Sequence, residues 1–269
     1  MKNDSLITVT KLHQMKISGD KISVLTSYDA SFTTLIENSG CEVILVGDSL
    51  GMVVQGKEST VPVTMKEMLY HTRMVRRTSG NCMVIADMPF LSYSSVDSAI
   101  KNAGKLMKQG GAHMVKLEGG AIRLDTVKAL SDHSIPVCAH LGLLPQSVHK
   151  LGGYKVQGRE NTQAEIILND AMALQQAGAD MLVLECVPVS LAAKITSSIT
   201  IPTIGIGAGV DCDGQVLVLY DMLGITSGQK PRFSKDFLSE SAGSIQTALN
   251  NYVNAVRDGS FPDKEHSYQ

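Results

Sequence analysis

The sequence predicts an α/β protein, a single (β/α)8 TIM barrel with a C-terminal helical extension. Eight short apolar runs, rich in β-branched residues, alternate with longer segments of helical character, as expected of repeated βα units. Short, continuous apolar runs are typical of parallel strands that are buried on both faces. An open doubly wound sheet is the alternative, because both folds place functional residues at the carboxyl ends of parallel strands.

Composition argues against several classes of protein. The 269 residues are 43% hydrophobic and 19% charged, and the formal net charge of −2 lacks the positive excess of proteins that bind nucleic acid or anionic lipid. No apolar run approaches the roughly 18 residues of a membrane span, and the N-terminus has no signal-peptide pattern. Five cysteines without a CxxC pair argue against a disulfide framework. We expect a cytoplasmic protein with one barrel domain over residues 1–269, including a short polar tail at about 258–269 that frays.

The strands are predicted from apolar runs bounded by turn residues. In chain order they are Ile22–Tyr28, Cys41–Asp48, Cys82–Met88, His113–Glu118, Ile135–Leu141, Met181–Cys186, Pro202–Ile206 and Gln215–Tyr220.

The helices are predicted from their capping residues and periodicity. Thr64 and Glu67 form a capping box that begins a helix ending near Thr78, and Thr162 and Glu165 form a second one. The other expected helices are residues 30–38, 95–109, 123–131, 191–197 and 235–256. Residues 49–63 and 142–160 have no helical periodicity, and connections of that length are commonly functional.

Three successive predicted strands end in an acid, namely Asp48, Asp87 and Glu118. Parallel strands bring these acids to one rim, where buried carboxylates repel one another unless a cation balances them. Hard oxygen ligands suit magnesium or a similar divalent ion. One such acid alone could simply cap a helix or face solvent, but the repetition on three strands favours a metal site.

Lys116 and Glu118 lie two residues apart on the fourth predicted strand, so their side chains point in the same direction. A barrel interior is normally filled by branched apolar side chains, so an inward lysine and glutamate must be paired, bound to a metal or used in chemistry. A buried structural ion pair is the alternative to a Lys116 that stabilises a substrate carboxylate or a developing enolate.

Three more polar residues lie near strand ends. Glu185 ends the sixth strand and is a candidate for proton transfer. His140, near the end of the fifth strand, and Tyr28, at the end of the first, are candidates for substrate binding. Each also has a purely structural interpretation: a strand-end acid, a satisfied core histidine and a packed tyrosine.

Several segments together resemble the ketopantoate hydroxymethyltransferase family. They are Val46–Ser49, Ala86–Phe90, Met114–Gly120, Gly152–Arg159 and Ile204–Gly209. The resemblance extends from about Thr26 to Thr226 and departs from the family at Tyr220, where members often have histidine. It implies a metal-dependent barrel of the phosphoenolpyruvate/pyruvate type that is cytoplasmic and decameric, with C-terminal helices packed between subunits.

The family activity implied by this resemblance is one-carbon transfer. A hydroxymethyl group would pass from 5,10-methylenetetrahydrofolate, the co-substrate, to 3-methyl-2-oxobutanoate, giving 2-dehydropantoate for pantothenate biosynthesis. The resemblance assigns magnesium binding, directly or through water, to Asp48, Asp87 and Glu118, keto-acid binding to Ser49 and Lys116, and the role of catalytic base to Glu185. We count Asp48 and Asp87 among the substrate-binding residues too, and we expect loop 142–160, with Tyr154, Lys155 and Arg159, to contact the folate.

Alternatives to this interpretation remain open. A magnesium-dependent carbon–carbon lyase or mutase of the same barrel superfamily would act on another α-keto acid. Lys116 could instead form a Schiff base with the keto acid. A barrel that binds a keto acid without turning it over is the non-enzymatic alternative.

Overall fold

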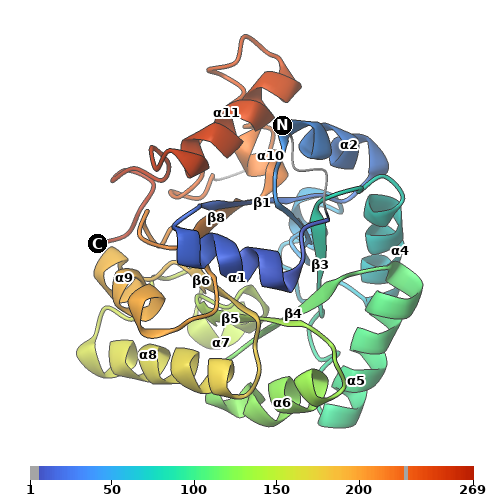
Figure 1. The fold of residues 1–269 in the computed structure, drawn as a ribbon, viewed down its shortest axis with the longest axis vertical. Coiled ribbons are helices and arrows are strands. Elements are labelled where there is room, and N and C mark those ends of the chain that lie inside the picture. Colours follow the sequence, from blue (N-terminus) through green and yellow to red (C-terminus); the bar gives the residue numbers. More distant parts are fainter. Residues whose placement is uncertain (1–5, 227–229) are drawn as a thin grey trace.

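Eight parallel strands close into a barrel in the computed structural model, which describes residues 6–226 and 230–269 (Figure 1). The strands pair in chain order, and β1 pairs with β8 to close the ring. This closure confirms the predicted barrel and excludes the open doubly wound sheet. The strands are β1 (Ile22–Thr26), β2 (Val43–Val46), β3 (Met83–Asp87), β4 (Met114–Glu118), β5 (Val137–Gly142), β6 (Met181–Glu185), β7 (Thr203–Ile206) and β8 (Gly214–Leu217).

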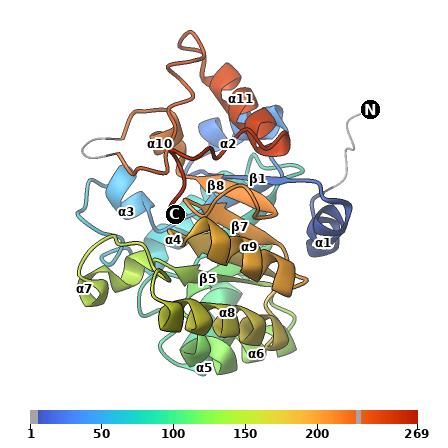
Figure 2. The ribbon, with the colours of Figure 1, turned by 90° about the vertical axis from the view of Figure 1, so that its left-hand side faces the viewer.

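Helices surround the strands, so nearly every strand residue is buried from both sides (Figures 1 and 2). They are α1 (Val9–Ser18), α2 (Ala30–Ser39), α3 (Leu50–Val53), α4 (Met65–Arg76), α5 (Val96–Lys105), α6 (Leu124–Asp132), α7 (Val148–Leu151), α8 (Asn161–Gln176), α9 (Val189–Ser198), α10 (Leu219–Met222) and α11 (Ile245–Arg257). Short turns of other helix types are η1 (Leu106–Gly110), η2 (Ala121–Arg123) and η3 (Pro145–Ser147). None of the helices in the described ranges has both the length and the apolar character needed to cross a bilayer.

Helix α1 lies in a stretch for which the sequence predicted no element. Only Leu12 and Met15 of its residues are buried, so its apolar pattern is weak. Lys16 Nζ donates to Asp213 Oδ2 at 2.7 Å, and Asp213 directly precedes β8. Helix α1 therefore covers the N-terminal end of the barrel, and Figure 2 shows it at the end opposite to α3 and α7. This arrangement leaves the carboxyl ends of the strands for the functional site.

The capping box of α4 is confirmed. Thr64 Oγ1 accepts a hydrogen bond from the Glu67 backbone N–H at 3.3 Å, and the Glu67 carboxylate accepts one from the Thr64 N–H at 2.6 Å. These contacts lower the pKa of Glu67 to about 2, mainly through the Thr64 N–H. The stabilisation from this carboxylate is therefore present above its ordinary pKa and is lost as pH falls towards 2.

The prediction of a second capping box, at Thr162 and Glu165, is wrong. Helix α8 begins at Asn161, and its N-cap, Glu160, makes no side-chain capping bond. Gln163 instead fixes the preceding loop, because its Oε1 accepts from the Gly158 N–H at 2.6 Å and its Nε2 donates to Gln157 Oε1 at 2.8 Å. The pattern Thr162–Glu165 therefore lies inside the helix and not at its start.

We expect Thr64→Ala to lower the free energy of unfolding by about 1 kcal/mol, the usual effect of losing an N-cap hydroxyl. The matched control is Thr162→Ala, which removes a hydroxyl from the failed motif and should change stability by less than about 0.5 kcal/mol. Urea unfolding followed by circular dichroism measures both. Equal losses in the two variants would contradict the assignment of a cap at Thr64 alone.

The C-terminal third departs from prediction in two elements. Strand β8 ends at Leu217, and Tyr220 lies in α10, where its ring packs 5.8 Å from that of Tyr28. Helix α11, the predicted C-terminal helix, begins at Ile245 and not near residue 235. Ala242 and Gly243 adopt left-handed backbone angles, φ 49° and 77°, which prevent the helix from extending further towards the N-terminus.

The polar tail does not fray as expected. Phe261 is buried against Tyr252 of α11, with ring centroids 5.9 Å apart. The backbone carbonyl of Tyr268 accepts a hydrogen bond from the Val189 N–H at 2.9 Å, at the start of α9. The tail therefore packs back onto the barrel, because its few apolar residues are spaced to reach the core.

Candidate active site

The strands position the predicted residues at one rim. Each side chain lies at or just beyond the carboxyl end of its strand: Tyr28 after β1, Asp48 and Ser49 after β2, Asp87 in β3, Lys116 and Glu118 in β4, His140 in β5 and Glu185 in β6. This rim is opposite to α1, where a TIM barrel carries its functional groups.

A buried ion pair joins two of these strands. Lys116 Nζ donates to Asp87 Oδ1 at 2.7 Å, and Asp87 Oδ2 accepts from the Asp48 N–H at 3.0 Å. Burial opposes the charge of Lys116, but the carboxylates of Asp87, Glu118 and Asp48 outweigh it and raise the Lys116 pKa above its ordinary value. Lys116 is therefore a fixed cation. The structure contains the buried ion pair that was the alternative to a role for Lys116 in stabilising charge on the substrate.

The ion pair does not balance the charge at the rim. Burial, followed by the charges of Asp87 and Glu118, raises the pKa of Asp48 well above its ordinary value. One lysine thus faces three buried carboxylates. His140, which lies 3.6 Å from Glu118 and 3.3 Å from Glu185, adds a second positive charge, so two cationic side chains face four acids and a divalent ion would relieve the remaining repulsion.

A line of three charged groups crosses the rim from β4 to β6. His140 Nδ1 lies 3.6 Å from Glu118 Oε1, and His140 Nε2 lies 3.3 Å from Glu185 Oε2. Burial and the charge of Lys116 disfavour protonation of His140, but the two glutamates outweigh them and raise the His140 pKa to about 9. His140 therefore connects the predicted metal ligand Glu118 to the predicted base Glu185.

The structure brings Tyr28 and Ser49 together. The Tyr28 hydroxyl and Ser49 Oγ are 2.8 Å apart, and the tyrosine is buried against Tyr220. Burial raises the pKa of Tyr28, so its hydroxyl remains protonated. Tyr28 packs as the structural interpretation predicts and also orients Ser49 at the rim.

The long loop 142–160 contains η3 and α7. The Tyr154 hydroxyl lies 3.4 Å from the Met52 sulfur in α3, and partial burial, followed by the charge of Glu185, raises the pKa of this hydroxyl. Tyr154 therefore lies near the rim residues, and like Lys155 and Arg159 it is exposed. The expected folate contacts of this loop stay a prediction.

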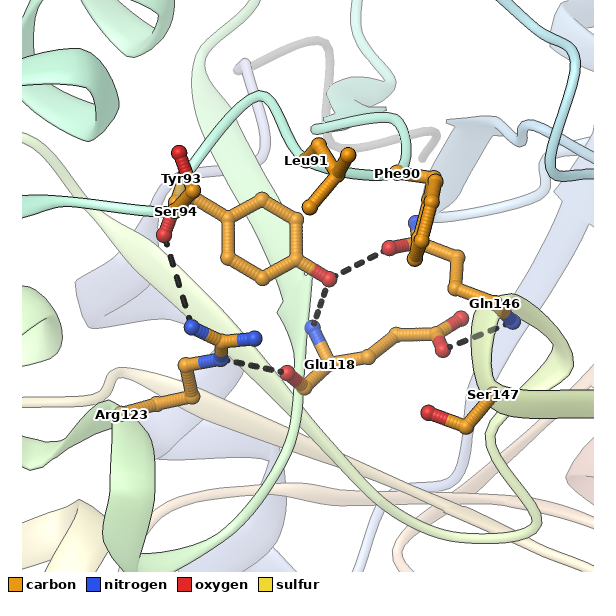
Figure 3. Close-up of a pocket in the computed structure, with 8 residues that line it drawn as sticks. All are labelled: Phe90, Leu91, Tyr93, Ser94, Glu118, Arg123, Gln146 and Ser147. Carbon is orange, nitrogen blue, oxygen red and sulfur yellow. Dashed lines mark hydrogen bonds between the residues drawn. The ribbon is translucent and has the colours of Figure 1, made fainter. Parts of the chain in front are cut away.

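Two residues at the site were not found from the sequence, Gln146 and Tyr93. Gln146 Nε2 donates to Asp48 Oδ2 at 2.8 Å, and the Tyr93 hydroxyl donates to Gln146 Oε1 at 2.5 Å. Figure 3 shows both residues beside Glu118, on the wall of a cavity of about 230 Å³. The only available signal was the position of Gln146 in the non-periodic segment after the fifth strand.

Magnesium or a similar divalent ion fits the residues at this rim. Over residues 6–226 and 230–269, no three histidine, cysteine or acidic side chains form a ready-made metal cluster. Magnesium, however, usually takes only one or two carboxylates and keeps several waters. Asp48 and Asp87 are adjacent, and Glu118 Oε1 is buried without a hydrogen-bond partner among the described residues. The three acids supply oxygen donors of the kind magnesium takes, directly or through water, and this assignment stays a prediction.

Comparisons with known proteins agree with the fold and with the family that the sequence resembles. Residues 6–264 match the family model described as ketopantoate hydroxymethyltransferase. Two relatives named 3-methyl-2-oxobutanoate hydroxymethyltransferase are those of Alkalilimnicola ehrlichii, 56% identical over 97% of this chain and 94% of the relative, and of Nitrosococcus oceani, 58% identical over 97% and 99%. Phosphoenolpyruvate phosphomutase from Streptomyces platensis subsp. rosaceus shares the fold, with 14% identity, a TM-score of 0.62 and 94% of each chain covered.

Proposed function

The chain belongs to the ketopantoate hydroxymethyltransferase family, and on that premise we propose that it transfers a hydroxymethyl group from 5,10-methylenetetrahydrofolate to 3-methyl-2-oxobutanoate. The product would be 2-dehydropantoate, a precursor of pantothenate. It is an enzyme, and the observation that carries the proposed chemistry is the group of three carboxylates and one lysine at the rim. Glu185 approaches the same rim from β6.

The chemistry requires removal of the C3 proton of an α-keto acid, which is only weakly acidic. A divalent cation held by Asp48, Asp87 and Glu118, directly or through water, would act as a Lewis acid towards the keto and carboxylate oxygens. Lys116 supplies fixed positive charge to the oxygen on which negative charge develops. Ser49, oriented by Tyr28, donates to the substrate carboxylate.

Glu185 is the base in this proposal. Its carboxylate is partly exposed, and His140 lies 3.3 Å from Glu185 Oε2 on the side of the barrel interior. Contact with a cationic His140 orients the carboxylate before proton abstraction. Water supplies the hydroxyl oxygen: hydrolysis breaks the bonds of the methylene carbon to the folate nitrogens and releases tetrahydrofolate, with the carbon at the oxidation level of formaldehyde. The carbanion at C3 attacks this carbon, and Glu185 returns its proton to the new alkoxide. We place the folate against loop 142–160.

The Schiff-base alternative requires a neutral lysine amine. Lys116 is paired with Asp87 at 2.7 Å and its pKa is raised, so it is protonated at neutral pH. Treatment with borohydride in the presence of 3-methyl-2-oxobutanoate should therefore leave no adduct detectable by mass spectrometry. A covalent adduct at Lys116 would favour the Schiff base instead.

Removal of the metal is expected to abolish activity. EDTA should reduce formation of 2-dehydropantoate by at least about 10²-fold, because the charge on the substrate oxygens is then no longer stabilised. Excess magnesium should restore it, and an apo enzyme with full activity would contradict the proposal.

The same assay without methylenetetrahydrofolate tests the lyase or mutase alternative, which predicts consumption of an α-keto acid without the folate.

The cellular context is part of the same proposal. The five cysteines are free and buried, which suits the reducing cytoplasm. The substrates are small molecules, and we propose a homo-oligomer, a decamer by family resemblance. Sedimentation equilibrium would test the subunit number.

A further inference from the structure

Gln146 is a buried residue that contacts two of the three acids at the rim. Its side-chain Nε2 donates to Asp48 Oδ2 at 2.8 Å, and its backbone N–H donates to Glu118 Oε2 at 3.1 Å. The same Nε2 donates to the carbonyl of Met88, which follows β3, at 3.0 Å. One residue thus connects groups from β2, β3 and β4, the strands that carry the acids.

The orientation of the Gln146 amide follows from its partners. A carboxylate and a backbone carbonyl can only accept hydrogen bonds, so the NH₂ group must face Asp48 and Met88. The Tyr93 hydroxyl donates to Gln146 Oε1, and it accepts from the Glu118 N–H at 3.3 Å (Figure 3). Tyr93 therefore fixes the amide and is itself fixed by the backbone of β4.

These bonds leave one oxygen of each acid free. Gln146 occupies Oδ2 of Asp48 and Oε2 of Glu118. In the described part of the chain, Glu118 Oε1 is buried without a hydrogen bond, although His140 Nδ1 lies 3.6 Å from it, and Asp48 Oδ1 accepts none from another residue. Binding one oxygen of a carboxylate fixes the direction of the other, as the groups behind the ligands of metal sites do.

We propose that Gln146, oriented by Tyr93, is a positioning residue that fixes the Asp48 and Glu118 carboxylates for a divalent cation. The inference rests on the proposed function, because it needs a cation at the rim. In this arrangement Gln146 and Tyr93 do not touch the cation or the keto acid, but they set the geometry of the carboxylates that do.

The test is the affinity of the full-length apo protein for Mn²⁺, measured from the electron paramagnetic resonance signal of the free ion. Gln146→Met keeps the size and flexibility of the side chain but removes its amide, so the hydrogen bonds to Asp48 and Met88 are lost while the backbone N–H bond to Glu118 stays. We expect it to weaken Mn²⁺ binding by about 10- to 100-fold. Tyr93→Phe removes only the hydroxyl that orients the amide, and it should weaken binding in the same direction by about 3-fold or more, roughly what one misoriented hydrogen bond contributes.

Gln215→Met is the matched control. Gln215 is a buried glutamine of β8 whose Nε2 donates to the Gly209 carbonyl at 2.9 Å, and it contacts no acid of the rim. The Mn²⁺ affinity of Gln215→Met should stay within about 2-fold of the wild type. Loss of a buried glutamine elsewhere in the barrel does not change the orientation of the acids that would bind the ion. Saturating Mn²⁺ should also restore most of the turnover of Gln146→Met, which a purely structural defect would not permit.

The outcomes separate this inference from the proposed function. Wild-type affinity in both Gln146→Met and Tyr93→Phe would overturn the positioning role while leaving the metal site intact. If Gln146→Met does not fold, unchanged affinity in Tyr93→Phe alone overturns it. An equal loss in Gln215→Met would also overturn it, and a wild-type protein that binds no Mn²⁺ would overturn both proposals.

Discussion

Replacing Glu185 with glutamine is expected to abolish detectable proton exchange at C3 of the keto acid and to lower turnover by about 10²- to 10⁴-fold. Glutamine keeps the shape of the side chain and its approach to His140, which lies 3.3 Å from Glu185 Oε2 in the wild type. It cannot accept a proton from carbon. Keto-acid binding should be retained, because the proposed binding groups lie on β1 to β5 and not on β6.

Proton exchange isolates this step from the rest of the reaction. With the folate omitted, the wild type should exchange the C3 proton of 3-methyl-2-oxobutanoate in D₂O containing magnesium, followed by NMR. Glu165→Gln, at an exposed acid on α8, is the control and should exchange at the wild-type rate. Calorimetric titration of the keto acid into Glu185→Gln reports binding. Exchange at the wild-type rate in Glu185→Gln would exclude it as the base, and the absence of exchange in the wild type would favour a barrel that only binds.

Most of the barrel could be predicted because its strands are buried on both faces. That environment produces uninterrupted apolar runs such as Val43–Val46, whose position is visible without any structure. Helix α1 gave no such signal, because it covers only the end of the barrel and buries just Leu12 and Met15. The true start of α8 was equally hidden, since Gln163 bonds to the preceding loop through tertiary contacts that local sequence does not specify.

The candidate site likewise contains residues that the sequence could predict and residues that it could not. Asp87, Glu118 and Glu185 end strands in the structure, so the rule that strand ends meet at one rim was enough to group them. Gln146 is held by hydrogen bonds to groups 28 and 98 residues away in the chain. Its loop has no periodicity, and glutamine has no characteristic spacing, so only the folded arrangement identifies it.

Replacing Lys116 with methionine is expected to affect both stability and turnover. The substitution leaves Asp87 buried and unpaired, which should lower the free energy of unfolding by about 3–5 kcal/mol without a metal. Turnover should fall by about 10²- to 10³-fold, because a fixed charge near the substrate oxygens is lost. The acids then carry their full mutual repulsion, so magnesium should raise the melting temperature of this variant more than that of the wild type.

Lys16→Met is the matched control for this result. Lys16 pairs with Asp213 at the same distance of 2.7 Å, with side chains 13% and 14% exposed, at the opposite end of the barrel. It should lose some stability and show no additional response to magnesium, because no acids of the rim are near it. Thermal unfolding of both variants with and without magnesium makes the comparison. If magnesium raises the melting temperature of neither variant, the aspartates do not form a metal site. Equal rises in both would mean that Lys116 does not offset the charge of the acids.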